Sequence, residues 1–162
     1  MTSVKSSKRK LPVARARRPR SRARVAPLSQ TAEYALRALS QLAAQRPARA
    51  LTAQELARLT LVPASYLSKI LRKLVAAGLL DSQKGHGGGF VLSRPAVTVR
   101  LSDVLDAVDE MPSEERCAFG WGDCDAAHPC PLHPAWSRLN NALREWATST
   151  TLQDVAGKAH RR

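Results

Sequence analysis

The chain has 162 residues, of which 44% are hydrophobic and 4% aromatic, enough for one compact domain with an appendage but not for two domains with separate cores. Its formal net charge is +13, because 26 Lys and Arg outnumber 13 Asp and Glu. No apolar run approaches the roughly 20 residues of a membrane-spanning helix, so the sequence excludes an integral membrane protein. Three closely grouped cysteines are too few for the disulfide framework of a secreted protein, and we expect a soluble protein in a reducing compartment.

The charge is unevenly distributed along the chain. Residues 1–27 hold ten Lys and Arg and no acid, residues 28–100 hold ten with three acids, and residues 101–162 hold six with ten acids. A basic part joined to an acidic part indicates that one part meets a polyanion while the other has a different role. We therefore expect a basic tail, a binding domain and a further functional region over these three ranges.

The basic tail, residues 1–27, has low complexity and no apolar periodicity. Because like charges repel and almost no side chain there can be buried, we expect it to be disordered. It also lacks the apolar core of a secretory signal. We interpret it as a solvated tail, and the alternative is an arm that binds nucleic acid without sequence preference.

Three amphipathic helices are predicted in the first part of the binding domain. Apolar residues recur at helical spacing over 29–45. A short second helix over 53–59 is indicated by Thr52 and Glu55, which have the spacing of a capping box. A third helix is expected over 64–77, after a tight turn.

The third helix has an outer face of hydroxyl groups and cations, opposite its leucines. A helix, a tight turn and a second helix with such a face are typical of a helix-turn-helix, whose second helix enters a major groove. On this pattern alone, a plain pair of packed helices with a solvated face is an equal alternative. The residues of the outer face are Ser65, Tyr66, Ser68, Lys69, Arg72 and Lys73.

The segment that follows decides between these alternatives. Two short strands are predicted over 79–82 and 90–93, and the loop between them has four glycines within residues 85–89. With Lys84 and His86 at its tip, this hairpin is typical of the wing of a winged helix, placed to reach a minor groove or phosphates. A phosphate-binding loop is excluded, because no helix follows the glycines directly. The predicted fold is mainly α-helical with a small β-wing.

The third region begins with a short predicted helix over 102–110 and continues into a Gly- and Pro-rich segment with Cys117, Cys124, Cys130 and His133. Such a loop can gather three soft thiolates around one centre. Paired C-x-x-C knuckles of structural zinc are absent, whereas iron–sulfur clusters tolerate wider spacing. A metal or cluster site is favoured slightly over a redox-active thiol pair, and both over inert cysteines.

A heptad stripe follows the cysteine segment. From Trp136, the residues Leu139, Leu143, Trp146 and Thr150 recur at alternating spacings of three and four. This stripe suits pairing with a second copy of the helix, and the alternative is packing against its own domain. Because a DNA-binding protein of this size gains affinity from a second half-site, we favour a homodimer.

Taken together, these motifs resemble the Rrf2 (Rrf-two) family of bacterial regulators. The resemblance covers about residues 28–157 and rests on the segments 34–39, 65–74 and 87–95 together with the three spaced cysteines. It implies a cytoplasmic winged-helix dimer, in which a long C-terminal helix crosses its partner and double-stranded DNA is the ligand. It also implies an iron–sulfur cluster on the cysteine loop that controls DNA binding.

The resemblance also implies the ligands of this cluster. Cys117, Cys124 and Cys130 match the three thiolate positions. The branch of the family that regulates cluster assembly places its fourth ligand at His133, whereas the nitric-oxide-sensing branch places it at Glu33, supplied by the partner subunit. The sequence also offers His128 as a third candidate. The first cysteine spacing departs by one residue from the His-ligated branch, so branch and cluster type stay open, with His133 and a 2Fe–2S rather than a 4Fe–4S cluster preferred.

The leading hypothesis is therefore a transcription regulator, usually a repressor, whose DNA binding is gated by the cluster. Base edges are expected to be read by Ser65, Tyr66, Ser68 and Lys69. Phosphates and the minor groove are expected to be contacted by Arg72, Lys73, Lys84 and His86. The alternative is a cluster-free regulator that senses thiol oxidation or a small ligand. An enzyme with a cysteine nucleophile and a histidine base is not expected, since no oxyanion motif accompanies these residues.

Overall fold

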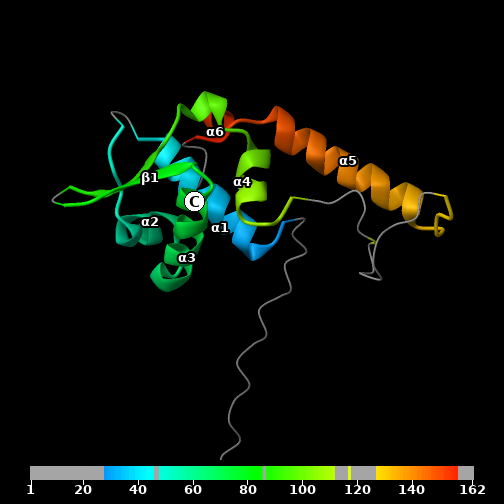
Figure 1. The fold of residues 1–162 in the computed structure, drawn as a ribbon, viewed down its shortest axis with the longest axis horizontal. Coiled ribbons are helices and arrows are strands. Elements are labelled where there is room, and N and C mark those ends of the chain that lie inside the picture. Colours follow the sequence, from blue (N-terminus) through cyan, green and yellow to red (C-terminus); the bar gives the residue numbers. More distant parts are fainter. Residues whose placement is uncertain (1–27, 46–47, 86, 112–116, 118–126, 157–162) are drawn as a thin grey trace, which may run out of the picture.

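The computed structural model describes residues 28–45, 48–85, 87–111, 117 and 127–156 (Figure 1). The fold of these residues is mostly helical with one two-stranded antiparallel sheet, which confirms the predicted fold class. Its elements are α1 (Gln30–Ala43), α2 (Ala53–Thr60), α3 (Ala64–Ala76), β1 (Leu80–Gln83), β2 (Gly89–Leu92), the 3-10 helix η1 (Ala96–Thr98), α4 (Leu101–Ala107), α5 (His133–Ser149) and α6 (Leu152–Val155).

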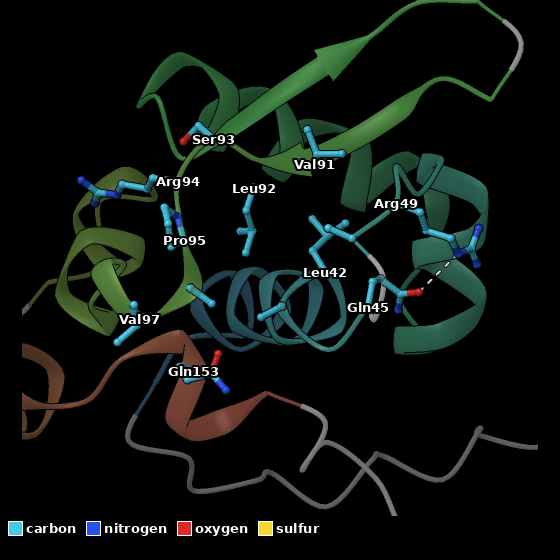
Figure 2. A pocket seen from close by; sticks show the side chains of 13 residues that line it. Leu42, Gln45, Arg49, Val91, Leu92, Ser93, Arg94, Pro95, Val97 and Gln153 are labelled. Carbon is cyan, nitrogen blue, oxygen red and sulfur yellow. Dashed lines mark hydrogen bonds between the residues drawn. The ribbon is translucent and has the colours of Figure 1, made fainter.

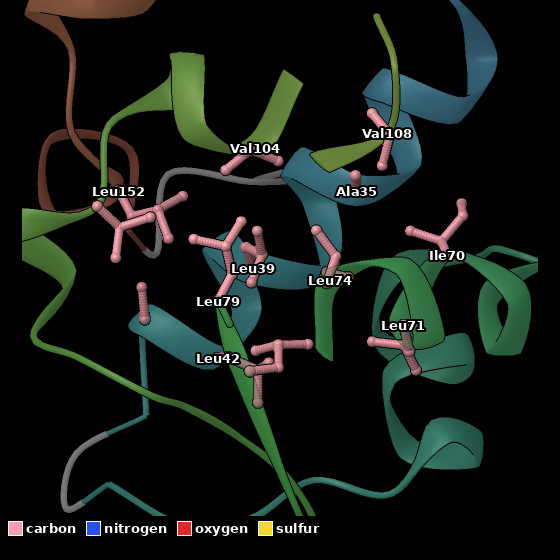
Figure 3. Close-up of a cluster of buried hydrophobic side chains, with 14 of the residues drawn as sticks. Ala35, Leu39, Leu42, Ile70, Leu71, Leu74, Leu79, Val104, Val108 and Leu152 are labelled. Carbon is pink, nitrogen blue, oxygen red and sulfur yellow. The ribbon is translucent and has the colours of Figure 1, made fainter. Parts of the chain in front are cut away.

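Helix α1 lies at the centre of the core. Its N-cap is Ser29, whose Oγ accepts a hydrogen bond from the Ala32 N–H at 3.2 Å. One face of the helix is buried along its whole length, and α2, α3, α4, α6 and β2 all contact the helix. The buried side chains that gather around it in Figure 3 include Leu71, Leu74, Val104 and Leu152.

A capping box begins α2, as the sequence predicts. The Thr52 N–H donates to Glu55 Oε2 at 2.8 Å, and the Glu55 N–H donates to Thr52 Oγ1 at 3.2 Å. The Thr52 N–H and the Thr52 hydroxyl, which donates to the same Glu55 Oε2 at 2.9 Å, hold the pKa of Glu55 below its ordinary value, and the nearby Arg49 guanidinium adds to this effect. Because the folded pKa is lowered, the stabilisation is present at neutral pH and is lost as the pH falls through that lowered value.

The turn between α2 and α3 bends at Leu61, whose φ of 57° lies in the left-handed region. The next residue, Val62, is buried, and its N–H donates to the Ala57 carbonyl at 3.2 Å. Pro63 then serves as the N-cap of α3, where its missing N–H breaks no helical hydrogen bond. The two helices are thus joined by a tight turn at the predicted place.

The wing is a hairpin that is also fastened to the segment before α2. Ser82 of β1 pairs with Phe90 of β2, and Phe90 exchanges two backbone hydrogen bonds with Leu51, at 2.8 and 3.0 Å. A Cβ at Gly89 would lie 2.6 Å from the backbone of Leu51, and φ at Gly89 is 152°. Only glycine fits this position, because the two backbones approach too closely for a side chain.

Helix α5 extends away from the other helices like an arm, and its N-terminal end lies at the tip of this arm in Figure 1. Its other end is anchored by backbone hydrogen bonds from Leu101 N–H to the Thr150 carbonyl, at 3.0 Å, and from Leu152 N–H to the Val99 carbonyl, at 2.9 Å. Helix α6 then packs against α1 and η1. Among the described residues, no helix combines the length and the apolar character needed to cross a lipid bilayer.

The predicted helices over 29–45, 53–59 and 64–77 and both predicted strands are found within two residues of their expected bounds. The helix predicted over 102–110 is too long, because α4 ends at Ala107 and the backbone turns at Asp109, whose φ is 62°. The sequence analysis did not identify η1 or α6, which are too short to show a periodic pattern.

Replacing Leu61 by glycine is expected to raise the free energy of unfolding by about 0.5–1 kcal/mol. A left-handed backbone costs a leucine about 1–2 kcal/mol, and glycine avoids this cost. Glycine also raises the conformational entropy of the unfolded chain, so the net gain in stability is smaller. The Leu61 side chain is 79% exposed, so little burial is lost. Urea denaturation measures the change. Leu59→Gly, in helical backbone two residues earlier, is the control and should lose about 1 kcal/mol. Equal losses in both variants would contradict the prediction.

Candidate nucleic-acid interface

Helix α3 buries one side and presents the other to solvent. Ser65, Lys69 and Arg72 are exposed and are spaced by four and three residues, so they form one stripe along the helix. The side chains of Lys69 and Arg72 make no hydrogen bond or ion pair with any residue that the structure describes. The side chains on the opposite, buried side are Leu67, Ile70, Leu71 and Leu74.

Tyr66 lies on the flank of α3 that faces α1. Its hydroxyl lies 2.8 Å from Thr31 Oγ1, and its ring packs edge-on against Tyr34 with 5.6 Å between centroids and 86° between planes. Gln30 Nε2 in turn donates to the Tyr34 hydroxyl at 2.8 Å. The Tyr66 hydroxyl is therefore already hydrogen-bonded within the protein, where the first turns of α1 and α3 meet.

Lys73 lies on the same flank of α3, two turns after Tyr66. Its Nζ is 2.7 Å from Asp109 Oδ2, in the turn that follows α4. Both side chains are largely exposed, so this ion pair contributes at most about 1 kcal/mol to stability. Its consequence is electrostatic: the positive charge of Lys73 is partly neutralised by a carboxylate of the same chain.

The wing adds a further cation beside α3. Lys84 is exposed directly after β1, and His86, the other residue predicted at the tip, lies outside the described residues. Helix α3 itself has three cations and no acid. A surface with this charge suits the phosphates of a nucleic acid. Ser68, the remaining predicted contact, donates its hydroxyl proton to the Ala64 carbonyl at 2.8 Å.

A cavity of about 460 Å³ lies elsewhere, between α1, the base of the wing and α6 (Figure 2). Leu42 and Leu92 are among its apolar lining residues. Its two arginines are already paired within the protein, Arg49 with Glu55 at 3.3 Å and Arg94 with Asp103 at 2.5 Å. Neither arginine of the cavity is therefore left without a partner to bind an anionic ligand.

The cysteine segment is described only in part. Cys117 is half-buried and Cys130 is exposed, whereas Cys124 lies outside the described residues. Within the described ranges, no three potential metal-ligating side chains gather. The structure consequently does not test the predicted three-thiolate site as a whole.

His133 is the predicted ligand with the most informative surroundings. It begins α5, and its backbone N–H donates to the Cys130 carbonyl at 3.0 Å. Its Nδ1 atom is buried and has no hydrogen-bond partner among the described residues. Such an atom is costly unless something else binds it. The alternative ligand Glu33 instead accepts a hydrogen bond from Arg37, at 3.2 Å on the same helix.

The heptad stripe of α5 lies mostly outside the core. Leu139 is 57% exposed and Trp146 is 40% exposed, while Ala147 and Asn140 are buried on another side of the helix. Helix α5 contacts α4 within the chain. The alternative considered from the sequence was packing of the stripe against its own domain. Leu139 and Trp146 are not covered in this way by the described residues.

Two partners of the candidate interface were not found from the sequence. Thr31 is 35 residues from Tyr66, and Asp109 is 36 residues from Lys73. Neither pairing has a local sequence signal, because each depends on how α1 and α4 pack against α3. The left-handed turn at Asp109 was also missed, although aspartate favours turns and is enriched at positive φ, which is the signal that could have ended the predicted helix earlier.

A basic helix follows a tight turn, and a hairpin that pairs with the segment before α2 lies beside it. These elements define a winged helix-turn-helix, a class of DNA-binding proteins. Residues 28–158 match the model of the Rrf2 family, described as iron-dependent transcriptional regulators. The chain therefore belongs to the Rrf2 family of DNA-binding transcriptional regulators.

Individual relatives agree with this assignment. An HTH-type transcriptional regulator of Mycobacterium tuberculosis is 35% identical over 133 residues, which is 82% of each chain. The HTH-type transcriptional regulator IscR of Escherichia coli is 28% identical over 142 residues, covering 82% of this chain and 87% of IscR. The structure of CymR, the global cysteine regulator of B. subtilis, shares the fold with a TM-score of 0.68 at 22% identity, covering 82% of this chain and 98% of CymR.

Replacing Asp109 by asparagine is expected to strengthen DNA binding and to steepen its salt dependence. Lys73 then becomes available to one more phosphate, which changes the slope of log affinity against log salt by about 0.9 for each protomer bound. Asparagine tolerates the left-handed backbone of this turn. Fluorescence anisotropy over a series of salt concentrations measures the slope.

Asp106→Asn is the matched control for that experiment. Asp106 is an exposed acid of α4 that does not pair with Lys73, so its loss changes the net charge equally. An equal response of both variants would show that general charge, rather than release of Lys73, is responsible.

Proposed function

We propose that the chain is a homodimeric transcription regulator of the bacterial cytoplasm, usually acting as a repressor, whose binding to operator DNA is gated by an iron–sulfur cluster on residues 117–133. The observation that carries this proposal is the buried Nδ1 of His133, which has no hydrogen-bond partner in the part of the chain that the structure describes and lies three residues after the exposed Cys130. The iron-dependent description of the family supports it.

The DNA-binding part divides its work between α3 and the wing. In this proposal Ser65 and Lys69 contact base edges, and Arg72 and Lys84 neutralise phosphates. His86 is proposed to reach the minor groove from the tip of the wing. The Tyr66 hydroxyl is engaged with Thr31, which favours a role in positioning α3 over direct contact with a base.

The donor set of the cysteine segment fits an iron–sulfur cluster. Cys117, Cys124 and Cys130 are proposed to supply thiolates, and His133 an imidazole nitrogen. A histidine ligand has precedent in 2Fe–2S centres, which favours this type over 4Fe–4S. When bound, such a cluster supplies a centre that responds to oxidants or nitric oxide. The buried Nδ1 of His133 then gains the partner that it lacks among the described residues.

Glu33 remains the alternative fourth ligand. It lies on α1 in the body of the molecule, whereas the N-terminal end of α5 lies at the far tip of the arm (Figure 1). Within one chain these positions are well separated, so Glu33 enters the site only from a second copy. Its ion pair with Arg37 must then open. His133 requires neither step, which favours it.

Gating follows from where the ligands lie along the chain. The segment between Met111 and His133 joins α4, which packs on the core, to α5, which leaves it. Holding this segment in one arrangement fixes α5 relative to the winged domain. A change at the site then alters the separation of two recognition helices in a dimer, and a palindromic operator responds to that separation.

The exposed stripe of α5 supports the homodimer. Leu139 and Trp146 are large apolar side chains on the outside of the described chain, in the heptad spacing that a second helix can cover. Two copies related by a two-fold axis bury both stripes against each other. They also present two α3 helices to the two halves of one operator.

A cluster-free regulator that senses oxidation of its thiols is the second candidate. The exposure of Cys130 favours it, because an accessible thiol can react directly with an oxidant. Anaerobic analysis of iron and acid-labile sulfide separates the two candidates, since only the cluster protein contains both.

Replacing Lys84 by alanine is expected to flatten the salt dependence of operator binding by about 0.9 in slope for each protomer bound, because one phosphate contact is lost. Anisotropy titrations over several salt concentrations provide the slope. Arg138→Ala removes the same charge from the exposed surface of α5 and serves as control. An unchanged slope in Lys84→Ala shows that the wing does not contact the backbone.

Replacing Cys124 or Cys130 by alanine is expected to abolish the visible absorption of protein purified without oxygen and to remove its iron and sulfide. His133→Ala should lower iron content and shift the spectrum. His128→Ala removes the exposed histidine of the same segment, and it should keep full iron content and colour if His133 is the ligand. Full colour in Cys130→Ala argues against the thiolate assignment, and loss of colour in Glu33→Ala with retention in His133→Ala assigns the fourth ligand to Glu33.

A further inference from the structure

The stripe of α3 that faces solvent has cations and hydroxyl groups but no carboxylate or carboxamide. Between Leu61 and Leu80 the chain has no aspartate, glutamate, asparagine or glutamine. The side chains that recognise adenine and cytosine in a major groove are carboxamides and carboxylates, which accept a hydrogen bond from an exocyclic amino group. Helix α3 has none of them.

The hydroxyl groups of α3 do not supply a base preference either. Tyr66 Oη is engaged with Thr31 Oγ1 at 2.8 Å, and Ser68 Oγ donates to the Ala64 carbonyl at 2.8 Å. Ser65 is exposed, but a serine hydroxyl both donates and accepts and therefore suits any base. Hydrogen-bonded discrimination between bases by α3 then depends on the remaining polar groups of the stripe.

Those remaining groups are cations, and the structure distinguishes them. Lys73 is held by Asp109 at 2.7 Å on the flank toward α4. Lys69 lies in the middle of the exposed stripe, one turn after Ser65, and has no partner among the described residues. Arg72 lies one turn further toward the C-terminal end, where recognition helices approach the backbone more than the bases.

We infer that the recognition helix reads guanine, through Lys69. An ammonium group donates only, and guanine alone presents two adjacent acceptors, N7 and O6, to the major groove. Adenine offers N7 beside an amino group, which opposes a second donor. The inference rests on the proposed function, since it requires α3 to lie in the major groove, and it adds the base on which the operator depends.

The test is a selection from randomised duplex DNA with the full-length protein and two variants, Lys69→Gln and Arg72→Gln. Glutamine is a good helix former and both positions are exposed, so both variants should fold. Glutamine pairs with adenine through N6 and N7. Lys69→Gln should therefore replace one guanine of each selected half-site by adenine, with a preference that changes by about 10- to 100-fold. Arg72→Gln should weaken all sequences alike and leave the consensus unchanged.

A chemical substitution in the DNA tests the same contact without altering the protein. Guanine at the affected position is replaced by 7-deazaguanine, which lacks the N7 acceptor, and binding is measured by anisotropy. On this modified DNA the wild-type protein should lose about tenfold in affinity. The reference is the affinity of Lys69→Gln for its own selected site, in which the guanines are unmodified.

The inference is overturned if Lys69→Gln selects the wild-type consensus, or if 7-deazaguanine leaves the wild-type affinity unchanged. Failure of the proposed function is a different result. In that case the wild-type protein enriches no sequence above the starting pool, so no consensus exists for the variants to change.

Discussion

Burial of helix α1 is the constraint on which the rest of the fold depends. The recognition helix, the second strand of the wing, α4 and α6 all contact this one helix, and its alanines at positions 32, 35 and 38 are fully buried. Small side chains let the neighbours approach closely, and a close-packed interior does not deform continuously. The surface proposed to contact DNA and the base from which α5 departs are therefore positioned by the same core.

Two polar contacts add to this packing on one flank of α3. Tyr66 touches Thr31 near the start of the helix, and Lys73 touches Asp109 near its end. The two contacts differ in what can replace them. A tyrosine packed edge-on against Tyr34 is held by its ring as well as by its hydroxyl, whereas an exposed ion pair exchanges readily with a phosphate. The first fixes the orientation of the helix, and the second tunes its charge.

The elements that could be predicted from the sequence are those with local signals. A capping box at Thr52 and Glu55 marks the start of α2, and the glycines before Phe90 mark the wing. The exposed face of α3 could be predicted from periodicity as well. The partners of Tyr66 and Lys73 could not, because they come from elements more than 30 residues away. His86 and Cys124 stay predictions, and the buried state of His133 Nδ1 has no signature in the sequence at all.

The proposed division between base reading and sensing follows from which parts belong to the core. Lys69 projects from a helix whose opposite side is fully buried, so its position relative to the wing is fixed. Helix α5 is anchored near Thr150 but extends beyond the core, and the cysteine segment precedes it. A change in that segment can therefore alter the distance between two recognition helices without altering the base that each one contacts. Such a regulator changes its affinity for an operator while keeping the same operator sequence, because spacing and base identity depend on different parts of the chain.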